Sequence, residues 1–278
     1  MIEPGLHHTL QVVRTSEQGV YLTRDEEEAI LLPNRYIPTG LQMEDEIEVF
    51  VYTDSQGRLI ATTLQPKITL HRFSFLEVTS VTQYGAFVDW GIAKELLVPF
   101  REQDKRLEAG QHTVVYLYKD EASGRLAGSA KVRKFLDNHQ VAVDTEEEVQ
   151  ILIYDQTELG YKAIVNDRHE GLIYSNEIYQ SVGIGQRLKA YVKKVREDGK
   201  LDLDLQPPGY SKVAPNAERI LNVLKDHDGW LPLTDKSSPQ AISEMLNMSK
   251  KTFKKSIGDL YKKRLIELKE DGIRLLIE

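Results

Sequence analysis

Cysteine is absent from this sequence of 278 residues, and long apolar runs are absent too. Without thiols the chain can form no disulfide, no thiolate metal site and no cysteine nucleophile, which excludes zinc ribbons and thiol redox enzymes. No run approaches the ~18 apolar residues of a membrane-spanning helix, and residues 1–10 lack the basic start and hydrophobic stretch of a secretory signal. We therefore expect a globular cytoplasmic protein, in keeping with 41% hydrophobic and 28% charged residues.

Motifs that carry catalysis or hold cofactors are also scarce. The sequence has no Walker loop, nucleophile elbow or metal-binding histidine pair. Asp202 and Asp204 resemble a metal pair, but their spacing is that of the outward face of a strand, and His7 and His8 have no matching third ligand. We expect no enzyme activity, no metal and no cofactor, while a nuclease site assembled from carboxylates distant in the sequence stays open.

The net charge of −7 is unevenly distributed along the chain. Residues 1–66 carry a net −7 and residues 141–213 a net −4, whereas residues 67–140 and 214–278 each carry a net +2. An acidic end and a more basic remainder suggest that an anionic ligand binds away from the N-terminus.

Glycines reveal an internal repeat. One set recurs at intervals of 66 and 75 residues: Gly19, Gly85 and Gly160. A second set follows the first by 38, 39 and 39 residues: Gly57, Gly124 and Gly199. The chain therefore contains three copies of one unit.

Each copy has the alternation of five β-strands. A first alternating strand precedes a second strand that begins at the first glycine, predicted at 19–22, 85–88 and 160–163. Third strands are predicted at 29–33, 95–99 and 170–174, and final hairpins at 46–60, 111–126 and 186–205. Five such strands in ~60 residues are typical of a small closed barrel whose inward side chains fill the lumen.

A different domain is predicted after the Pro-Pro-Gly at 207–209, where the apolar period becomes helical. A first helix is followed by Ser238 and a proline, which predict the start of a second helix, and Ser249 is the predicted cap of a third. Two short strands at 266–268 and 273–277 follow. This order of helix, helix, turn, helix and two-stranded wing is typical of a winged helix-turn-helix.

The second and third copies resemble the ribosomal S1 RNA-binding domain, which is an OB-fold. The similar residues are 84–89, 95–99 and 124–125 in the second copy, and 169–175 and 198–201 in the third. Three such domains followed by a winged helix resemble the conserved virulence factor B family (CvfB/YitL-like) of bacterial RNA-binding proteins over essentially the whole chain. The resemblance implies single-stranded RNA as the ligand and a role in post-transcriptional, virulence-associated gene regulation.

The resemblance also implies where RNA would lie. The family's S1 domains place two aromatics beside the glycine of the second strand, and a histidine on the third strand, on the RNA-facing surface. Tyr84 and Phe87 match the aromatics in the second copy, where Pro99 takes the histidine position, and Tyr174 takes that position in the third copy. The remaining positions hold Leu159 and Lys162 in the third copy and Gln18, Tyr21 and Pro33 in the first. Exposed rings stack on bases of any sequence, and the alternative is that these rings belong to the barrel core.

The fourth strand differs in charge among the copies. Its outward residues are Lys189, Tyr191 and Lys193, followed by Lys194, in the third copy; Val114, Tyr116 and Tyr118 in the second; and Glu48, Phe50 and Tyr52 in the first. Lysines neutralise phosphates, whereas glutamates repel them. The third copy is therefore predicted to bind RNA and the first is not, with a merely solvated strand face as the alternative.

Lysines also crowd the third helix of the winged domain, where residues 249–264 carry a net +6. Lys250 and Lys254, like Lys251 and Lys255, are i,i+4 pairs on adjoining faces, and phosphate binding would relieve their repulsion. A solvated helix face is the alternative. The third helix of this motif enters DNA in many regulators, so the residues alone do not separate RNA from DNA.

We therefore predict a mainly β protein with a C-terminal α+β domain. Three S1-type OB-fold five-stranded barrels, at 1–66 (acidic and degenerate), 67–140 and 141–213, precede a winged helix-turn-helix at 214–278. The predicted partner is single-stranded RNA, with DNA open for the winged helix and no membrane; the alternatives are a DNA-binding transcription regulator and a protein-interaction scaffold. The predicted RNA-binding residues are Tyr84, Phe87, Tyr116, Tyr118, Arg125, Lys162, Tyr174, Lys189, Tyr191, Lys193, Lys194, Lys200, Lys250, Lys251, Lys254 and Lys255.

Overall fold

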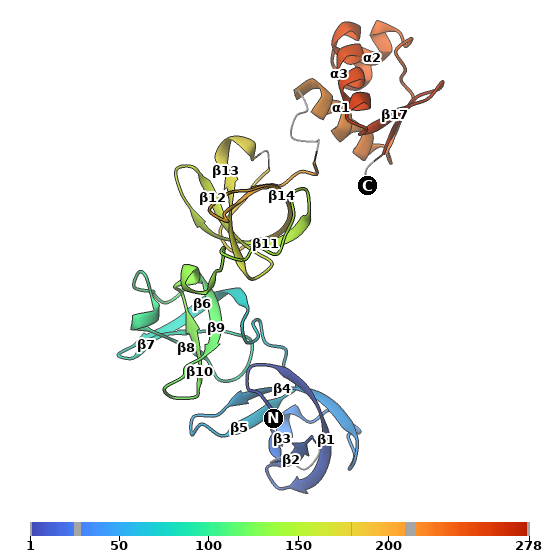
Figure 1. The fold of residues 1–278 in the computed structure, drawn as a ribbon. Helices are drawn as coiled ribbons and strands as arrows, with labels where there is room; N and C mark the ends of the chain where they lie inside the picture. Colours follow the sequence, from blue (N-terminus) through green and yellow to red (C-terminus); the bar gives the residue numbers. More distant parts are fainter. Residues whose placement is uncertain (1, 25–28, 179, 209–214, 277–278) are drawn as a thin grey trace.

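The computed structural model describes residues 2–24, 29–178, 180–208 and 215–276. Figure 1 shows three successive β-units followed by a small helical unit at the C-terminal end. The predicted fold class is confirmed: three five-stranded barrels, of which the second is nearly closed, precede a winged helix. The predicted boundary at 213–214 lies outside the described residues.

The barrels share one strand order. Barrel 1 contains β1 (His7–Ser16), β2 (Gly19–Thr23), β3 (Ile30–Pro33), β4 (Glu46–Thr53) and β5 (Leu59–Thr62). Barrel 2 contains β6 (Phe73–Thr82), β7 (Gly85–Val88), β8 (Leu96–Pro99), β9 (His112–Lys119) and β10 (Leu126–Ser129). Barrel 3 contains β11 (Glu148–Gln156), β12 (Gly160–Val165), β13 (His169–Tyr174), β14 (Arg187–Val195) and β15 (Leu201–Asp204). In barrels 1 and 3 the third strand pairs in parallel with the fifth, which closes the barrel.

The register repeats as well as the order. The first and fourth strands pair through His7 with Phe50, Phe73 with Tyr116, and Glu148 with Tyr191, positions separated by the same 66 and 75 residues as the glycines. A β-bulge interrupts each first strand at matching places, between Val12 and Arg14, Val78 and Ser80, and Ile153 and Asp155. Because bulges bend a strand strongly, the first strand of each barrel bends at the equivalent position of the repeat.

The interior of each barrel is filled by inward-facing side chains, which alternate with outward-facing ones along every strand. Leu22 in barrel 1, Val88 in barrel 2 and Val165 in barrel 3 are fully buried, as are Leu117 and Leu203. The smaller side chains next to the candidate aromatics of barrel 2, Ala86 and Val88, belong to this interior, as predicted.

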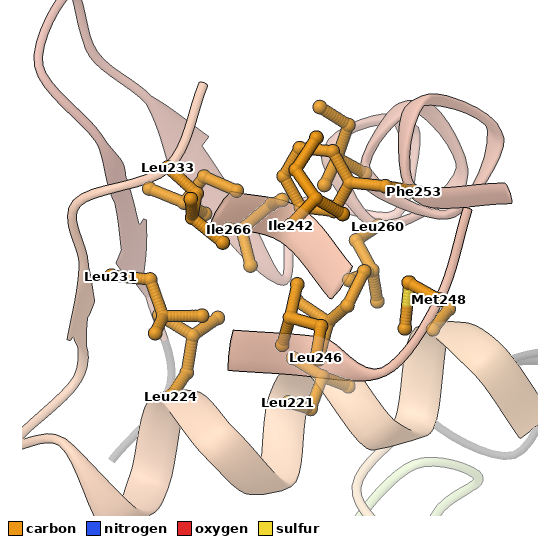
Figure 2. Packing of buried hydrophobic residues seen from close by; sticks show 14 of the residues in the cluster. Leu221, Leu224, Leu231, Leu233, Ile242, Leu246, Met248, Phe253, Leu260 and Ile266 are labelled. Carbon is orange, nitrogen blue, oxygen red and sulfur yellow. The ribbon is translucent and has the colours of Figure 1, made fainter. Parts of the chain in front are cut away.

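The winged domain consists of α1 (Pro215–Asp226), β16 (Trp230–Leu231), α2 (Pro239–Leu246), α3 (Lys250–Lys262), β17 (Ile266–Leu268) and β18 (Ile273–Leu275). Ser238 and Ser249 cap α2 and α3 by accepting hydrogen bonds from the backbone N–H groups of Ala241 and Thr252, as predicted. Figure 2 shows the buried side chains of the helices and the sheet packed into one core. The strand β16, which pairs with β18, was not predicted, and Ile277 lies outside the described residues.

Adjacent barrels pack directly against each other. At the first junction, Phe50 and Tyr52 of β4 make edge-on contacts with Trp90 of barrel 2, at ring-centroid distances of 5.6 and 6.5 Å. At the second junction, Phe73 and Val114 of barrel 2 share a buried cluster with three residues outside barrel 2's strands: Val132, Leu152 and Ile164. No helix in the described part of the chain is long and apolar enough to cross a membrane.

Candidate nucleic-acid interface

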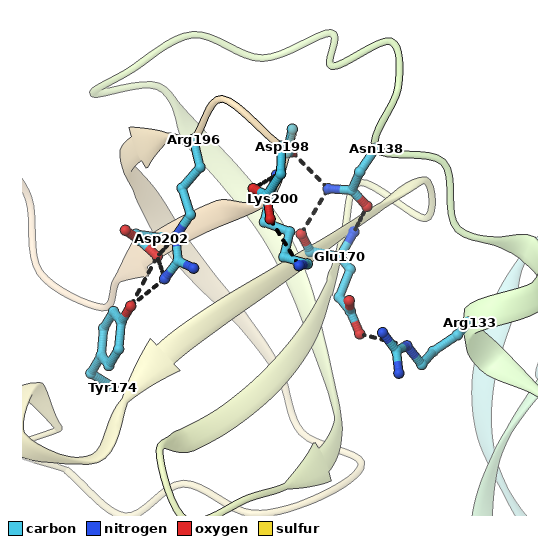
Figure 3. Close-up of polar contacts among 9 residues, drawn as sticks. Arg133, Asn138, Glu170, Tyr174, Arg196, Asp198, Lys200 and Asp202 are labelled. Carbon is cyan, nitrogen blue, oxygen red and sulfur yellow. Dashed lines mark hydrogen bonds and ion pairs between the residues drawn. The ribbon is translucent and has the colours of Figure 1, made fainter.

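A hollow of about 500 Å³, here named the barrel 3 groove, lies on the outer face of barrel 3. It spans β12, β13 and the hairpin between β14 and β15, and Figure 3 shows several of the polar side chains on this face. Its lining includes Arg133, Leu159, Lys162, Leu172, Arg196 and Lys200. Lys162 and Lys200, predicted separately from two motifs, therefore lie in one site.

Glycine at the start of β12 shapes this groove. A Cβ on Gly160 would lie 1.9 Å from the carbonyl oxygen of Ile173, so only glycine lets β12 and β13 approach this closely. The preceding residue, Leu159, points away from the barrel and is 66% exposed. Gly85 has the same close approach in barrel 2, where the preceding Tyr84 is 67% exposed. The position before the glycine is thus a solvent-facing platform in both barrels.

Carboxylates pair with the cations of the barrel 3 groove. Lys162 lies 3.0 Å from Asp155, and Lys200 lies 2.8 Å from Asp198. The hydrogen bond from Lys200 lowers the pKa of the Asp198 carboxyl, which keeps that carboxylate ionised. The Lys200 pair is exposed, whereas Lys162 is only 25% exposed. Exposed ion pairs contribute only ~0–1 kcal/mol, so an incoming phosphate can replace the Asp198 carboxylate at small cost.

Tyr174, at the position that the resemblance gives to a histidine, is tied into a polar network (Figure 3). Its hydroxyl lies 3.4 Å from a carboxylate oxygen of Asp202, and the Arg196 guanidinium donates to the same hydroxyl. Arg196 also pairs with Asp202 at 2.6 Å, and this hydrogen bond raises the pKa of the guanidinium. Asp202 is therefore held by a cation on the strand surface.

The outward residues of β14, named the β14 face, also carry paired cations. Lys189 is 67% exposed and lies 2.9 Å from Glu148, whose carboxylate also accepts a hydrogen bond from the Tyr191 hydroxyl at 3.1 Å. Lys193 pairs with Glu177. Lys194 is exposed, and its side chain has no ion pair among the described residues. The predicted alternation along this strand is confirmed, since Ala190 and Val192 are fully buried.

Barrel 2 places its two candidate rings differently. Tyr84 extends into solvent from the turn before β7, whereas Phe87 in the middle of β7 is half-buried. Arg125, predicted to bind RNA, is exposed and donates to the backbone oxygen of Ser55 at 3.4 Å. This contact joins the β9–β10 hairpin to the neighbouring hairpin of barrel 1.

Tyr116 and Tyr118 do not lie on an open surface. The Tyr116 ring stacks on Phe135 at a centroid distance of 4.1 Å and contacts Phe73 at 4.7 Å. Tyr118 lies 5.7 Å from Phe135, and the Lys134 ammonium lies over its ring. Barrel 3 and its connecting segment cover this face of β9, because the apolar residues around Tyr116 pack there. These two tyrosines hold the junction together and lie outside the proposed interface.

The lysines of α3 lie on its outer surface, opposite the core that Phe253, Ile257 and Leu260 form. The Lys250 ammonium donates to the backbone oxygen of Lys236 at 3.3 Å, and that of Lys254 lies 3.6 Å from Asp235. Lys251 and Lys255 are exposed and have no ion pair among the described residues. The helix therefore presents free positive charge to solvent.

Comparison with known proteins places the chain in a family. Residues 218–275 match the family model described as a CvfB-like winged helix domain, and residues 4–64 match the S1 domain model. The conserved virulence factor B of Staphylococcus epidermidis is 30% identical over 84% of this chain and 81% of its own length. This chain belongs to the conserved virulence factor B family.

Two further comparisons found similar proteins. The YitL protein of Bacillus subtilis, which is described as uncharacterized, is 31% identical to this CvfB-family protein over 94% of the chain and 90% of its own length. A solved structure from Streptococcus pneumoniae, described as a multidomain protein with nucleic acid binding domains, covers 98% of both chains with 24% identity and a TM-score of 0.44.

In this CvfB-family protein the S1 domain model matches barrel 1, the copy that the sequence predicts to be acidic and degenerate. Barrel 1 has a hollow of about 480 Å³ at the position of the barrel 3 groove, lined among others by Gln18, Tyr21 and Arg58. Arg58 pairs with Asp54 at 2.7 Å, and the Arg14 guanidinium covers the Tyr21 ring at 3.9 Å. The groove therefore recurs at the same place in barrels 1 and 3, and what differs between these two barrels is the charge of its lining.

Two groove cations were missed by sequence reasoning. Arg196 follows the alternating part of β14, and Arg133 belongs to the segment between barrels 2 and 3 rather than to a repeat. The available signal was the run of three basic residues at 131, 133 and 134 beside a repeat boundary.

The two weak metal signals of the sequence have structural explanations. Among the described residues no three His, Asp or Glu side chains are arranged to hold a metal ion. His8 is buried with its Nε2 2.8 Å from the carbonyl oxygen of Glu3, and His7 contacts the Phe50 ring. Asp202 pairs with Arg196, and Asp204, which was expected on an outward face, is only 6% exposed and accepts a hydrogen bond from the backbone N–H of Gln206.

Proposed function

We propose that this CvfB-family protein binds single-stranded RNA across barrels 2 and 3 and the winged helix, and thereby regulates gene expression after transcription. The barrel 3 groove carries the proposal. It combines an exposed apolar platform at Leu159 with the cations Lys162 and Lys200, and Leu159 takes the position in the repeat at which barrel 2 exposes the Tyr84 ring. Bases can lie on the platforms while phosphates replace the carboxylates beside the lysines.

The test is a titration of labelled single-stranded RNA at several salt concentrations. The double variant Lys162→Gln with Lys200→Gln removes two positive charges and keeps polar side chains of similar size. We expect about tenfold weaker binding, and a slope of log K against log salt that is smaller by ~1.4, at ~0.7 for each contact with a single strand.

The matched control is Arg168→Gln, which removes one charge from an exposed residue of barrel 3 that does not line the groove. We expect RNA affinity close to that of the unmodified protein. Unchanged affinity and slope in the double variant, with a native unfolding curve, would show that the barrel 3 groove does not hold RNA. The regulatory part is checked by transcript half-lives in cells that carry the double variant in place of the natural protein.

Duplex DNA is a second candidate ligand for the lysines of α3, because the third helix of a winged helix-turn-helix enters DNA in many regulators. Changing Lys250, Lys251, Lys254 and Lys255 to Gln removes the positive charge of this helix and keeps good helix formers. If RNA is the ligand, we expect the salt slope for single-stranded RNA to fall by ~1.4, because four lysines on two faces cannot all touch one strand. If DNA is the ligand, the loss appears with duplex DNA alone, and the RNA slope stays unchanged.

A further inference from the structure

The segment between barrels 2 and 3 is a short 3-10 turn, η3 (Val132–Phe135), wedged between the two barrels. Val132 is 5% exposed and packs in the junction cluster together with Phe135 and Leu136. Its exposed residues, Arg133 and Lys134, are both basic, and Lys131 directly precedes the turn. The ammonium of Lys134 is anchored by Glu102 of barrel 2 at 2.9 Å. The packing on one side and the ion pair on the other fix the position of the turn.

Arg133 lies where two hollows meet. It lines the barrel 3 groove, and it also lines a second hollow of about 280 Å³ between the barrels, which we name the junction hollow. The lining of the junction hollow also includes Asp104, Lys105 and Val114 of barrel 2 and Tyr154 and Asp155 of barrel 3. Arg133 is the only residue in these two linings that both hollows share.

The Arg133 guanidinium is held in place but remains available. Its ion pair is with Glu170 of β13 at 3.4 Å, as Figure 3 shows, and its side chain is 66% exposed. The Tyr154 hydroxyl donates to the same carboxylate, so Glu170 is fixed from the side of barrel 3. A guanidinium has five N–H donors in a planar fork, which leaves donors for a phosphate beside Glu170.

We propose that single-stranded RNA continues from the barrel 3 groove over Arg133 into the junction hollow, where Arg133 binds a backbone phosphate and Lys105 a neighbouring one. The inference rests on the proposed function and adds a site that belongs to neither barrel alone. RNA is the occupant that fits, because the junction hollow is continuous with the cationic groove through Arg133. The site exists only while the junction cluster holds the two barrels together.

The experiment compares two lengths of RNA on the full chain. OB-folds occupy ~4–16 nucleotides, so a ~4-nucleotide RNA fits within the barrel 3 groove, while a ~12-nucleotide RNA also reaches the junction hollow. Lys105 lines the junction hollow but not the groove, so for Lys105→Gln we expect about fivefold weaker binding of the longer RNA, a salt slope smaller by ~0.7, and less than about twofold change for the shorter RNA by competition. Arg133 lines both hollows, so Arg133→Gln should weaken both lengths of RNA, and the longer one more strongly.

Two controls keep the outcomes distinct. Arg133→Lys keeps the charge but loses the planar fork, so it should restore the salt slope and only part of the affinity. The groove variant Lys162→Gln with Lys200→Gln should weaken both lengths of RNA. If the groove variant weakens both while Arg133→Gln changes neither, the junction site is wrong and the proposed function stands. If neither variant changes binding of either RNA, both proposals are wrong.

Discussion

The fourth strand of barrel 2 and that of barrel 3 have the same place in the fold and opposite surroundings. The outward residues of β9, Val114 and Tyr116, are packed at a junction, and Phe50 and Tyr52 of β4 are packed in the same way in barrel 1. The β14 face has Lys189 and Lys193 instead, and it stays exposed.

This difference explains why no further barrel in the described part of the chain docks on the fourth strand of barrel 3. A lysine is almost never fully buried without a partner, because removing its charge from water is costly. Aromatic residues on this face let the next barrel dock, whereas lysines favour contact with water or with an anion. One strand position thus serves for assembly in two barrels and is free for a ligand in the third.

The strongest way to break this comparison is Phe73→Ala, at a position that is 1% exposed in the junction cluster. Removing a buried ring leaves a cavity, and we expect a loss of ~3–5 kcal/mol in the free energy of unfolding, measured by urea denaturation. Glu148→Ala is the matched control, because Glu148 takes the same register position in barrel 3 but is exposed. Equal destabilisation of the two variants would show that the β9 and β14 faces are equivalent.

A second pair of variants separates an effect on stability from an effect on RNA binding. Tyr116→Ala removes the stack on Phe135, so we expect roughly 2 kcal/mol of destabilisation, of which the ring pairs account for ~0.5–1.5 each beyond area burial. Tyr191→Ala should cost less than about 1 kcal/mol in stability, because surface substitutions have small effects. It should weaken RNA binding about fivefold, at the low end of the ~1–3 kcal/mol of a base stack. Weaker RNA binding by a fully folded Tyr116→Ala protein, with none for Tyr191→Ala, would reverse this assignment.

The charge on the β14 face gives a smaller effect. Lys189→Gln with Lys193→Gln should leave the unfolding curve unchanged and reduce the salt slope for single-stranded RNA by ~0.7–1.4, depending on whether one or both lysines contact phosphate. The measurement is RNA affinity between low and moderate salt. A slope equal to that of the unmodified protein would mean that the β14 face is only solvated.

Acid should affect the junction more than the β14 face. Burial alone would raise the pKa of Glu102, but hydrogen bonds from Ser129 and Lys134 outweigh it and lower that pKa below its usual value. Because the folded-state pKa is lower than the unfolded one, Glu102 stabilises the fold above the unfolded pKa, and this contribution is lost as the pH falls through the folded pKa.

We therefore expect Glu102→Gln to flatten the dependence of stability on pH in the acidic range, measured by thermal unfolding at pH 3 to 7. Hydrogen bonds from Lys189 and Tyr191 also lower the pKa of Glu148, but its carboxyl is exposed on the β14 face. Glu148→Gln should leave the same profile nearly unchanged. A flatter profile for Glu148→Gln than for Glu102→Gln would contradict the difference between the two faces.

Much of the site followed from particular residues of the sequence. The glycine spacing located the starts of β2, β7 and β12, and the residues predicted to bind RNA include Lys162 and Lys200, which the structure brings together in one groove. Arg133 and Arg196 could not be found in this way, because each joins the groove through the folding of a segment outside the repeated motifs. Asp204 shows the same limit, since strict alternation predicted an outward residue and the structure buries it.

The three barrels and the winged helix could be predicted from the sequence, because strand alternation, glycines at positive φ and serine caps act through local geometry and recur at fixed spacing. Which of the outward-facing residues remain exposed to solvent could not be predicted, because it depends on the packing of the barrels against one another. Tyr116 and Tyr191 occupy the same position of the repeat, yet one is stacked on Phe135 and the other lies beside an exposed lysine. The reason is physical: alternation fixes the side of the strand on which a residue lies, whereas its exposure depends on what packs against that side from elsewhere in the chain.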